Sequence, residues 1–244
     1  MPNPTAAMLV IGDEILSGRT REANMHHLAG VLTERGIDLK EVRVVSDEQS
    51  VIVPAVRYLS ETYTHLFTSG GIGPTHDDIT ADAVAIAMGA QIDVREDAQA
   101  ILAAHYAQSG TELNAARLRM ARIPEGAALI DNPVSAAPGF TLGNVHVMAG
   151  VPRIFEAMVA SLMPRLTGGV PLLSRSVRVE RPEGEVAGPL GDLAQVHAEL
   201  SFGSYPFHSE TGIGTNVVIR GTDSGMLDAA EVSLRERLAE TPPT

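Results

Sequence analysis

A glycine-rich stretch followed by paired acids is the part of the sequence best suited to chemistry. Residues 69–80 read Ser-Gly-Gly-Ile-Gly-Pro-Thr-His-Asp-Asp-Ile-Thr, between an apolar run at 65–68 and a helical pattern at 81–88 that Gly89 closes. Glycines let the backbone come close to a ligand, and free N–H groups at a helix start favour an anion. In open α/β sheets, ligands bind at such turns beyond the carboxyl ends of the strands. The stretch therefore predicts an anion site.

Two carboxylates follow this predicted anion site directly. Asp77 and Asp78 would repel a bound phosphate unless a divalent cation lay between them, so the pattern suggests a phosphate-bearing ligand with Mg²⁺ or a similar ion. A structural alternative is a tight turn in which one of the acids only caps the helix, because a glycine loop alone is weak evidence. Thr80 is the better N-cap candidate, with Asp82 in the first turn, which leaves the two acids without a capping role.

Acids also follow two earlier predicted strands. Asp13 and Glu14 come after the apolar run 6–11, and Asp47 comes after the run 37–45. The loops that follow parallel strands lie on one edge of a sheet, so these acids would meet the glycine-rich loop. Any single acid still has a structural interpretation, because acidic residues are common in the first turns of helices. Three acid-bearing loops on one edge favour a functional site.

Strands and helices alternate through the first two thirds of the chain. We expect strands at 6–11, 37–45, 65–68 and 127–130, a short extended piece after Gln91, and a hairpin of 140–142 and 145–148 about Gly143 and Asn144. We expect helices at 24–35, 51–63, 81–88, in the region up to 109, at 111–121 and at 153–166, with Pro54 in a first turn. This alternation predicts a largely parallel sheet with helices on both faces.

The pattern changes after residues 167–171, which have the composition of a linker. Strands are expected at 174–180 and 216–220, and helices at 190–200 and 226–239. We therefore predict two domains, an α/β domain at 1–168 and a small α+β domain at 172–240. Arg117, Arg119 and Arg122 are interpreted as a solvated helix face, and His76 as an exposed side chain.

Composition limits the classes of function. The chain has 244 residues and a formal net charge of −12, which disfavours nonspecific nucleic-acid binding. It contains no Cys, so disulfides, thiolate catalysis and Cys-ligated metals are excluded. No apolar run reaches the roughly 18 residues of a membrane span, and the first residues lack the features of a signal peptide. We expect a cytoplasmic protein with no membrane or nucleic-acid partner.

Four motifs in this order resemble the molybdopterin-binding (MoaB/MogA-like) domain. They are Gly-Asp-Glu-Ile-Leu-Ser-Gly at 12–18, the stretch 69–80, Asn132-Pro133 with Ala-Pro-Gly-Phe at 137–140, and Gly-Val-Pro-Arg at 150–153. The version is the one found at the N-terminus of competence/damage-inducible protein A (CinA) and in FAD synthase. The resemblance covers roughly residues 6–166 and implies a three-layer αβα fold whose glycine loop holds a phosphate. The C-terminal unit resembles, more weakly, the small domain that follows in such proteins.

The resemblance also implies roles for individual residues. Asp47 and Asp78 match acids that are important for function in the family, and Asp47, Asp77 and Asp78 are expected to hold a divalent cation. The motifs together predict a ligand site made of Gly12, Asp13, Glu14, Ser17, Gly18, Ser69, Gly70, Gly71, Ile72, Gly73, Pro74, Thr75, Thr80, Asn132, Pro138 and Gly139. The expected ligand is molybdopterin or another small phosphate-bearing pterin or nucleotide, and the family implies a homo-oligomer, either a dimer or a trimer.

Three functions remain open at this point. The first is a binding protein or biosynthetic enzyme for molybdopterin, and the second is a metal-dependent pyrophosphohydrolase for nucleotides such as ADP-ribose or FAD. The third is a non-catalytic homologue with a role in assembly or regulation. The chain departs from the family pattern at Ser135-Ala136, Ala149 and Ile154, where Gly-Thr, Pro and an acid are usual. These departures bear on the bound group more than on the fold.

Overall fold

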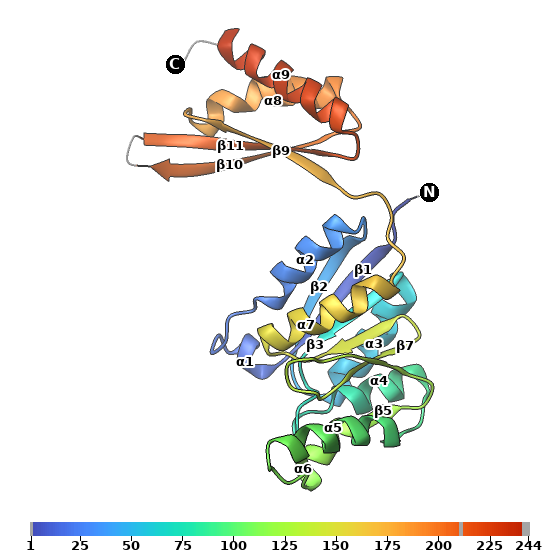
Figure 1. Cartoon of the computed structure of the whole chain (residues 1–244). Coiled ribbons are helices and arrows are strands. Elements are labelled where there is room, and N and C mark those ends of the chain that lie inside the picture. The colour runs from blue at the N-terminus through green and yellow to red at the C-terminus, as the bar shows by residue number, and fades with distance from the viewer. Residues whose placement is uncertain (1, 210–211, 241–244) are drawn as a thin grey trace. The chain divides into compact units, whose positions relative to one another are not determined.

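The computed structural model describes residues 2–209 and 212–240. The chain divides into two compact units, Met1–Gly169 and Val170–Thr244, and each is described here by itself. Figure 1 shows both units with their helices and strands labelled. No helix in the described ranges combines the length and the apolar character needed to cross a membrane.

The first unit is built on a six-stranded sheet that is parallel through its centre. The strand order is β2 (Asp38–Val45), β1 (Thr5–Ile11), β3 (His65–Ser69), β8 (Val145–Met148), β7 (Gly139–Leu142) and β6 (Ala128–Ile130). The first four strands in that order pair in parallel, whereas β7 pairs antiparallel with both of its neighbours. The fold is therefore the expected α/β fold, with the predicted hairpin of β7 and β8 forming one side of the sheet.

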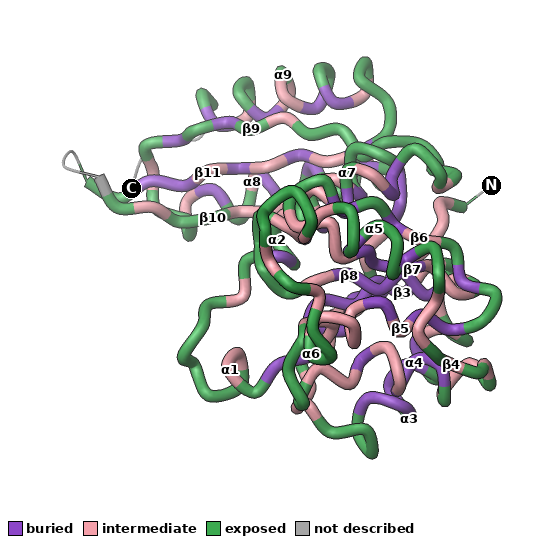
Figure 2. The backbone as a smooth tube through the Cα atoms, turned by 60° about the horizontal axis from the view of Figure 1, so that its bottom comes forward, coloured by how far each residue is buried: buried purple, intermediate pink, exposed green. Residues whose placement is uncertain are grey.

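Helices cover both faces of this sheet, which gives three layers (Figure 1). Alternate β1 side chains point to opposite faces, so that Leu9 packs with α3 (Gln49–Thr62), α4 (Thr80–Met88) and α5 (Glu96–Gln108), and Met8 with α2 (Asn24–Glu34) and α7 (Pro152–Leu162). Every residue of β1 after Thr5 is buried, as a central parallel strand requires. Figure 2 shows buried residues along the strands at the centre of this unit, and exposed residues concentrated on the outer sides of the helices and on the loops.

Smaller elements complete the first unit. A helix of four residues, α1 (Asp13–Leu16), lies inside the predicted loop 12–20, and β4 (Ile92–Val94) pairs with β5 (Arg122–Pro124) in a separate two-stranded sheet. The predicted helix at 111–121 is α6 (Ala115–Leu118) followed by a 3₁₀ turn, η1 (Arg119–Ala121). A second 3₁₀ turn, η2 (Met163–Arg165), follows α7.

Several predicted boundaries are wrong. Helix α3 begins at Gln49, so Pro54 lies in its second turn and not its first. Strand β5 and helix α1 were not expected, because elements of three and four residues are too short to show a period in the sequence. The stop at Gly89 is confirmed, since this residue ends α4 in the left-handed conformation, with φ of 69°.

The second unit is a three-stranded antiparallel sheet covered by two helices. The strand order is β10 (Ser201–Ser209), β11 (Gly212–Gly221) and β9 (Leu173–Val179), and the helices are α8 (Glu183–Val196) and α9 (Ser224–Glu240). Val177, Val217 and Ile219 of the sheet form one core with Leu193 of α8 and Leu234 of α9. The unit is therefore the expected small α+β domain.

Two features of this second unit differ from the prediction. Helix α8 begins seven residues before the expected start at 190, because its glycines and Pro189 hide a helical pattern that Glu183 and Glu185 open. Strand β10 was not expected, since Gly203 and Pro206 interrupt its apolar pattern.

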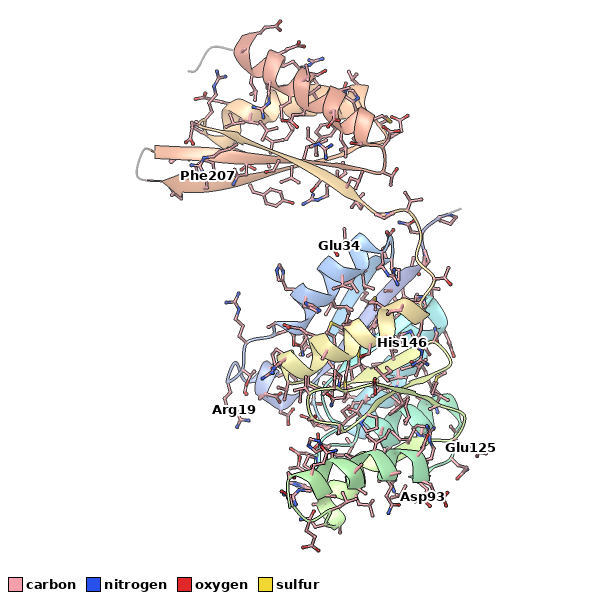
Figure 3. The ribbon with its side chains drawn as sticks, viewed as in Figure 1. Arg19, Glu34, Asp93, Glu125, His146 and Phe207 are labelled. Atoms are coloured by element: carbon pink, nitrogen blue, oxygen red, sulfur yellow. The ribbon has the colours of Figure 1, made fainter. Side chains whose placement is uncertain are left out.

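A pair of histidines, one buried and one half-buried, lies in the sheet of the first unit. His146 of β8 is 2% exposed, its Nε2 lies 3.1 Å from Nδ1 of His65, and its Nδ1 lies 3.0 Å from Oγ1 of Thr141 (Figure 3). Burial, with smaller contributions from the nearby positive charges of His65 and Arg165, lowers the pKa of His146 to about 3. The imidazole is therefore neutral in the folded protein.

This neutral histidine should make the protein sensitive to mild acid. Unfolding exposes His146 to water, where its pKa returns to about 6.5. The unfolded chain therefore binds a proton that the folded chain does not bind. Above pH 6.5 this difference in protonation does not reduce stability. Below pH 6.5 the free energy of unfolding decreases as the pH falls, by about 1.4 kcal/mol per pH unit for one proton. Urea unfolding at pH 7, 6 and 5 measures this slope.

The variant His146→Gln should flatten the dependence on pH, because an amide does not titrate. The matched control is His76→Gln, since the side chain of His76 is 100% exposed. We expect the control to keep the wild-type slope. Equal slopes for all three proteins would contradict the assignment.

Candidate functional site

A cavity of about 600 Å³ lies at the carboxyl edge of the parallel strands. The loops that follow β1, β2, β3, β6 and β8 all contribute to its wall. Strand β2 lies on one side of β1 and β3 on the other, so the loops after β1 and β3 separate at a topological switch point. A cavity of this size at this place is typical of a ligand site.

The glycine-rich loop enters this cavity through a tight contact between strand ends. Gly70 has a φ of 106°, and its N–H donates to the carbonyl oxygen of Met148 at 3.1 Å. A Cβ atom on Gly70 would collide with the carbonyl oxygen of Ile11, and one on Gly150 would lie 3.2 Å from the Cα of Gly70. The fold itself therefore requires glycine at position 70, because β1, β3 and β8 converge there.

The next residues of the loop present unpaired backbone donors. Within the described part of the chain, the N–H groups of Gly71, Ile72 and Gly73 donate no hydrogen bond, and all three residues line the cavity. Gly71 has a φ of 66°, and its carbonyl oxygen accepts from the N–H of Thr80 at 2.9 Å. Successive free N–H groups on a cavity wall form an anion-binding concavity.

The expected N-cap at Thr80 is wrong. Helix α4 starts at Thr80 itself, with Ile79 at the N-cap position and no capping side chain. The Thr80 side chain packs under Gly71, and its hydroxyl is buried without a hydrogen-bond partner among the described residues. Thr80 therefore supports the glycine loop from below and does not line the cavity.

Four carboxylates line the same cavity, from Glu14, Asp47, Asp77 and Asp78. The Asp47 carboxylate accepts from the N–H of Asp13 at 2.8 Å, which connects the loops after β1 and β2. Burial raises the pKa of Asp47, and the negative charges of Asp13, Glu14 and Asp77 add to that effect against the lowering by the hydrogen bond. The carboxylates that line the cavity thus carry more negative charge than the positively charged residues of its lining neutralise.

The carboxylates have the oxygen donors that a hard cation such as Mg²⁺ prefers. The described residues nevertheless contain no group of three or more His, Asp or Glu side chains already placed around one metal position. Asp78 is engaged elsewhere, because its Oδ2 accepts from both the N–H and the hydroxyl of Thr75, the former at 2.8 Å. The predicted cation ligands Asp47, Asp77 and Asp78 therefore share one cavity without forming a closed site.

Comparison with known proteins identifies the family. Residues 7–168 match the family described as "Probable molybdopterin binding domain", a match that covers more than half of the chain. The chain belongs to this molybdopterin-binding-domain family. Residues 171–242 match a second family, "FAD synthase, middle domain".

Individual relatives are similar over different shares of their length. A protein of Metallosphaera sedula is 36% identical over 164 residues, which cover 65% of this chain and 62% of that protein. The protein named "Probable FAD synthase" of Caenorhabditis elegans is 31% identical over 260 residues, covering 96% of this chain and 50% of its own length. The chain therefore spans less than two thirds of these relatives, and their whole-protein activities do not transfer to it directly.

A solved structure supports the fold of the first unit. The crystal structure of the protein CinA from Thermoplasma acidophilum has a TM-score of 0.61 and 34% sequence identity, covering 66% of this chain and 98% of that one. The molybdopterin-binding domain of the present chain thus has a CinA-like fold, in agreement with the resemblance read from the motifs.

The structure brings together about half of the residues predicted for the site. The predicted residues that line the cavity are Glu14, Asp47, Gly70, Gly71, Ile72, Gly73, Pro74, Asp77, Asp78 and Asn132. Those outside its lining are Gly12, Asp13, Ser17, Gly18, Ser69, Thr75, Thr80, Pro138 and Gly139. Several of this second group position the first, as Asp13 does for Asp47 and Thr75 for Asp78.

Two buried asparagines hold loops of the molybdopterin-binding domain in place. The Nδ2 of Asn24, the first residue of α2, donates to the hydroxyl of Ser69 at 2.8 Å and to the carbonyl oxygen of Gly150 at 2.7 Å. Asn132 uses its whole amide within its own loop, donating to Ser135 and Ala137 and accepting from two backbone N–H groups. Asn132 therefore shapes the wall more than it presents a free group to a ligand.

Sequence reasoning missed several parts of the cavity wall. The additional lining residues are Ile11, Arg19, Thr20, Met120, Ser135, Ala137, Ala149, Gly150, Val151, Pro152 and Ile154. The segment 149–154 follows β8, and its place beside β3 was not predictable from the hairpin pattern. The motif at 150–153 was a signal that could have placed it in the site.

The interpretation of Arg119 and Arg122 as solvated is also wrong. Both are half-buried and line a small hollow behind the glycine loop. Arg119 donates from Nη2 to the carbonyl oxygen of Asp78 at 3.4 Å, and Arg122 forms an ion pair with Asp82 of α4. These arginines support the segment that carries the acids.

The contact at Gly70 gives a stability prediction. Gly70→Ala should destabilise the protein by about 2 kcal/mol or more, because the new Cβ meets backbone in addition to the cost of the left-handed conformation. Gly18→Ala is the matched control, since Gly18 also has a positive φ, of 72°, but open space around its Cβ direction. Its cost should be about 1 kcal/mol. Equal losses in chemical denaturation would mean that the contact with Ile11 is not limiting.

Proposed function

We propose that the cavity binds a phosphate-bearing nucleotide or pterin together with a divalent cation. The observation that carries the proposal is the row of three backbone N–H groups of Gly71, Ile72 and Gly73, which have no partner in the described residues and belong to residues that line the cavity. Backbone donors of this kind suit phosphate oxygens because they are fixed in place and carry no net charge. The family match supports the same class of ligand.

The cation belongs to the proposal for an electrostatic reason. Glu14, Asp47 and Asp77 would repel a phosphate in the same cavity, and the pKa of Asp47 is raised first by burial and then by the negative charges of its neighbours. Asp47, Asp77 and Asp78 are the residues that would hold the ion. A bound divalent cation would supply a positive charge that neutralises phosphate oxygens and polarises the phosphorus centre. The chain's own part is to orient the acids, through the N–H of Asp13 for Asp47 and through Thr75 for Asp78.

The variant Asp47→Asn tests this proposal. An asparagine oxygen can still accept from the N–H of Asp13, so the variant removes the charge and keeps the hydrogen bond. We expect the Mg²⁺-dependent part of ADP binding, measured by calorimetry with and without the ion, to disappear. Without the ion, the variant should melt at a higher temperature than the wild type, because burial and the neighbouring negative charges both disfavour ionised Asp47.

Asp93→Asn is the matched control for this experiment. Asp93 is exposed, lies outside the cavity lining and also accepts from a backbone N–H, that of Val94, at 2.7 Å (Figure 3). This control should bind ADP and Mg²⁺ as the wild type does. Unchanged cation dependence in Asp47→Asn would remove Asp47 from the site, and failure of wild-type protein to bind any phosphate compound would overturn the proposal.

A second candidate function is hydrolysis of a nucleotide pyrophosphate such as FAD or ADP-ribose. Two findings favour it: the match of residues 171–242 to the middle domain of FAD synthase, and the similarity to a probable FAD synthase along 96% of the chain. The reaction adds water across one P–O–P bond, so that FAD would give FMN and AMP. In this reading Asp47, Asp77 and Asp78 would hold the divalent cation, which would polarise a phosphoryl oxygen beside the glycine loop and activate the attacking water.

Turnover of a small panel separates the two candidates. FAD, ADP-ribose and NAD are incubated with Mg²⁺, Mn²⁺ or Co²⁺, and products are separated by chromatography. Cleavage that requires both the ion and Asp47, but not Asp93, would establish a pyrophosphohydrolase. Binding without cleavage would leave a binding protein. Absence of both would favour a role in assembly, for which light scattering would give the predicted homo-oligomeric state.

A further inference from the structure

One cationic side chain, that of Arg19, belongs to the wall of the acidic cavity. Arg19 lies in the short loop between α1 and α2, and Figure 3 shows its side chain extending away from the packed body of the unit. Its guanidinium makes no hydrogen bond or ion pair with any described residue, although Glu14, Asp47, Asp77 and Asp78 line the same cavity. An arginine that shares a cavity with four carboxylates and pairs with none has its donors available to a ligand.

The backbone that carries Arg19 is well fixed. Gly18 turns the chain with a φ of 72°, and its N–H donates to the carbonyl oxygen of Ile15 at 3.1 Å. On the other side, the N–H of Thr20 donates to the carbonyl oxygen of Glu14 at 2.9 Å. Helix α1 is itself held by the hydrogen bond from Asp13 to Asp47. The side chain of Arg19 therefore starts from a defined point on the rim.

The cavity consequently has two separate elements that suit phosphate. One is the row of backbone N–H groups at 71–73, and the other is Arg19, an exposed residue at the cavity rim whose planar guanidinium offers a fork of donors that matches phosphate oxygens. They come from different loops, after β3 and after α1, on the wall of a cavity of about 600 Å³. A ligand with a single phosphate can satisfy one element, whereas a ligand with two linked phosphates can satisfy both.

We propose that Arg19 is a specificity-determining residue that contacts the second phosphate of a diphosphate ligand, so that the cavity prefers nucleoside diphosphates and dinucleotides to monophosphates. This inference rests on the proposed phosphate site at the glycine loop. It deepens that proposal, because a monophosphate pterin and a nucleotide pyrophosphate are the two ligand classes left open above.

The experiment compares ADP with AMP, each with Mg²⁺, by isothermal titration calorimetry on the full chain. The variants are Arg19→Met, which keeps the length and apolar character of the stem, and Arg21→Met as the matched control. Arg21 is an exposed arginine of the same loop that does not line the cavity. Arg19→Met should weaken ADP binding about tenfold to a hundredfold, the range of one charge-assisted contact, and should leave AMP binding nearly unchanged.

Each outcome bears on a different claim. Wild-type protein that binds neither ADP nor AMP would overturn the phosphate site itself. Wild-type binding of ADP that Arg19→Met does not weaken, or that Arg21→Met weakens equally, would overturn the assignment of Arg19 while leaving the glycine-loop site intact. Equal weakening of ADP and AMP by Arg19→Met would also overturn it, because Arg19 would then add only general charge. Arg19→Lys should restore part of the ADP affinity, since it returns the charge without the planar fork.

Discussion

The structure depends on the close convergence of three strand ends where residue 70 has no side chain. Gly70 meets the carbonyl oxygen of Ile11, donates to that of Met148 and lies against Gly150, so β1, β3 and β8 reach the sheet edge together. The loops that leave these strands all contribute to the cavity wall, and the one after β3 contributes the residues whose N–H groups have no partner among the described residues. A side chain at this point would separate the strands and open the wall of the site. The glycine motif is thus explained first by packing and only then by a ligand.

The electrostatics of the cavity oppose the stability of the empty protein. Four carboxylates share one wall in a chain whose net charge is already −12. The raised pKa of Asp47 means that its ionised form is disfavoured in the folded state, so part of the folding free energy is lost until a positive charge arrives. Repulsion between like charges that does not contribute to packing is typical of functional sites. The carboxylates are therefore the reason for including a cation in the proposed site.

Much of the fold was predictable because its signals are local. The apolar run of β1 and the stop at Gly89 were visible in the sequence, as was the hairpin about Gly143. Strand β10 was hidden by Gly203 and Pro206, and α8 by Pro189, since tertiary packing there overrides weak local preference. In the site, the acids after three strands were predictable from the parallel pattern. Arg19 was not predictable as a site residue, because it reaches the site only through a cavity formed by loops that are distant in the chain.

The side-chain amide of Asn24 is a group whose chemical modification would disturb the cavity. Both hydrogens of its amide are used, one on Ser69 at the end of β3 and one on Gly150 after β8, so a single NH₂ group links the end of β3 to the loop after β8. Hydrolysis of that amide during storage or ageing would replace the double donor with a carboxylate that faces the Gly150 carbonyl oxygen as a second acceptor. This modification changes the mass by one unit and hardly changes the size of the side chain, yet it would loosen two loops at once. The arrangement of these two segments accordingly depends on the chemical integrity of one buried amide.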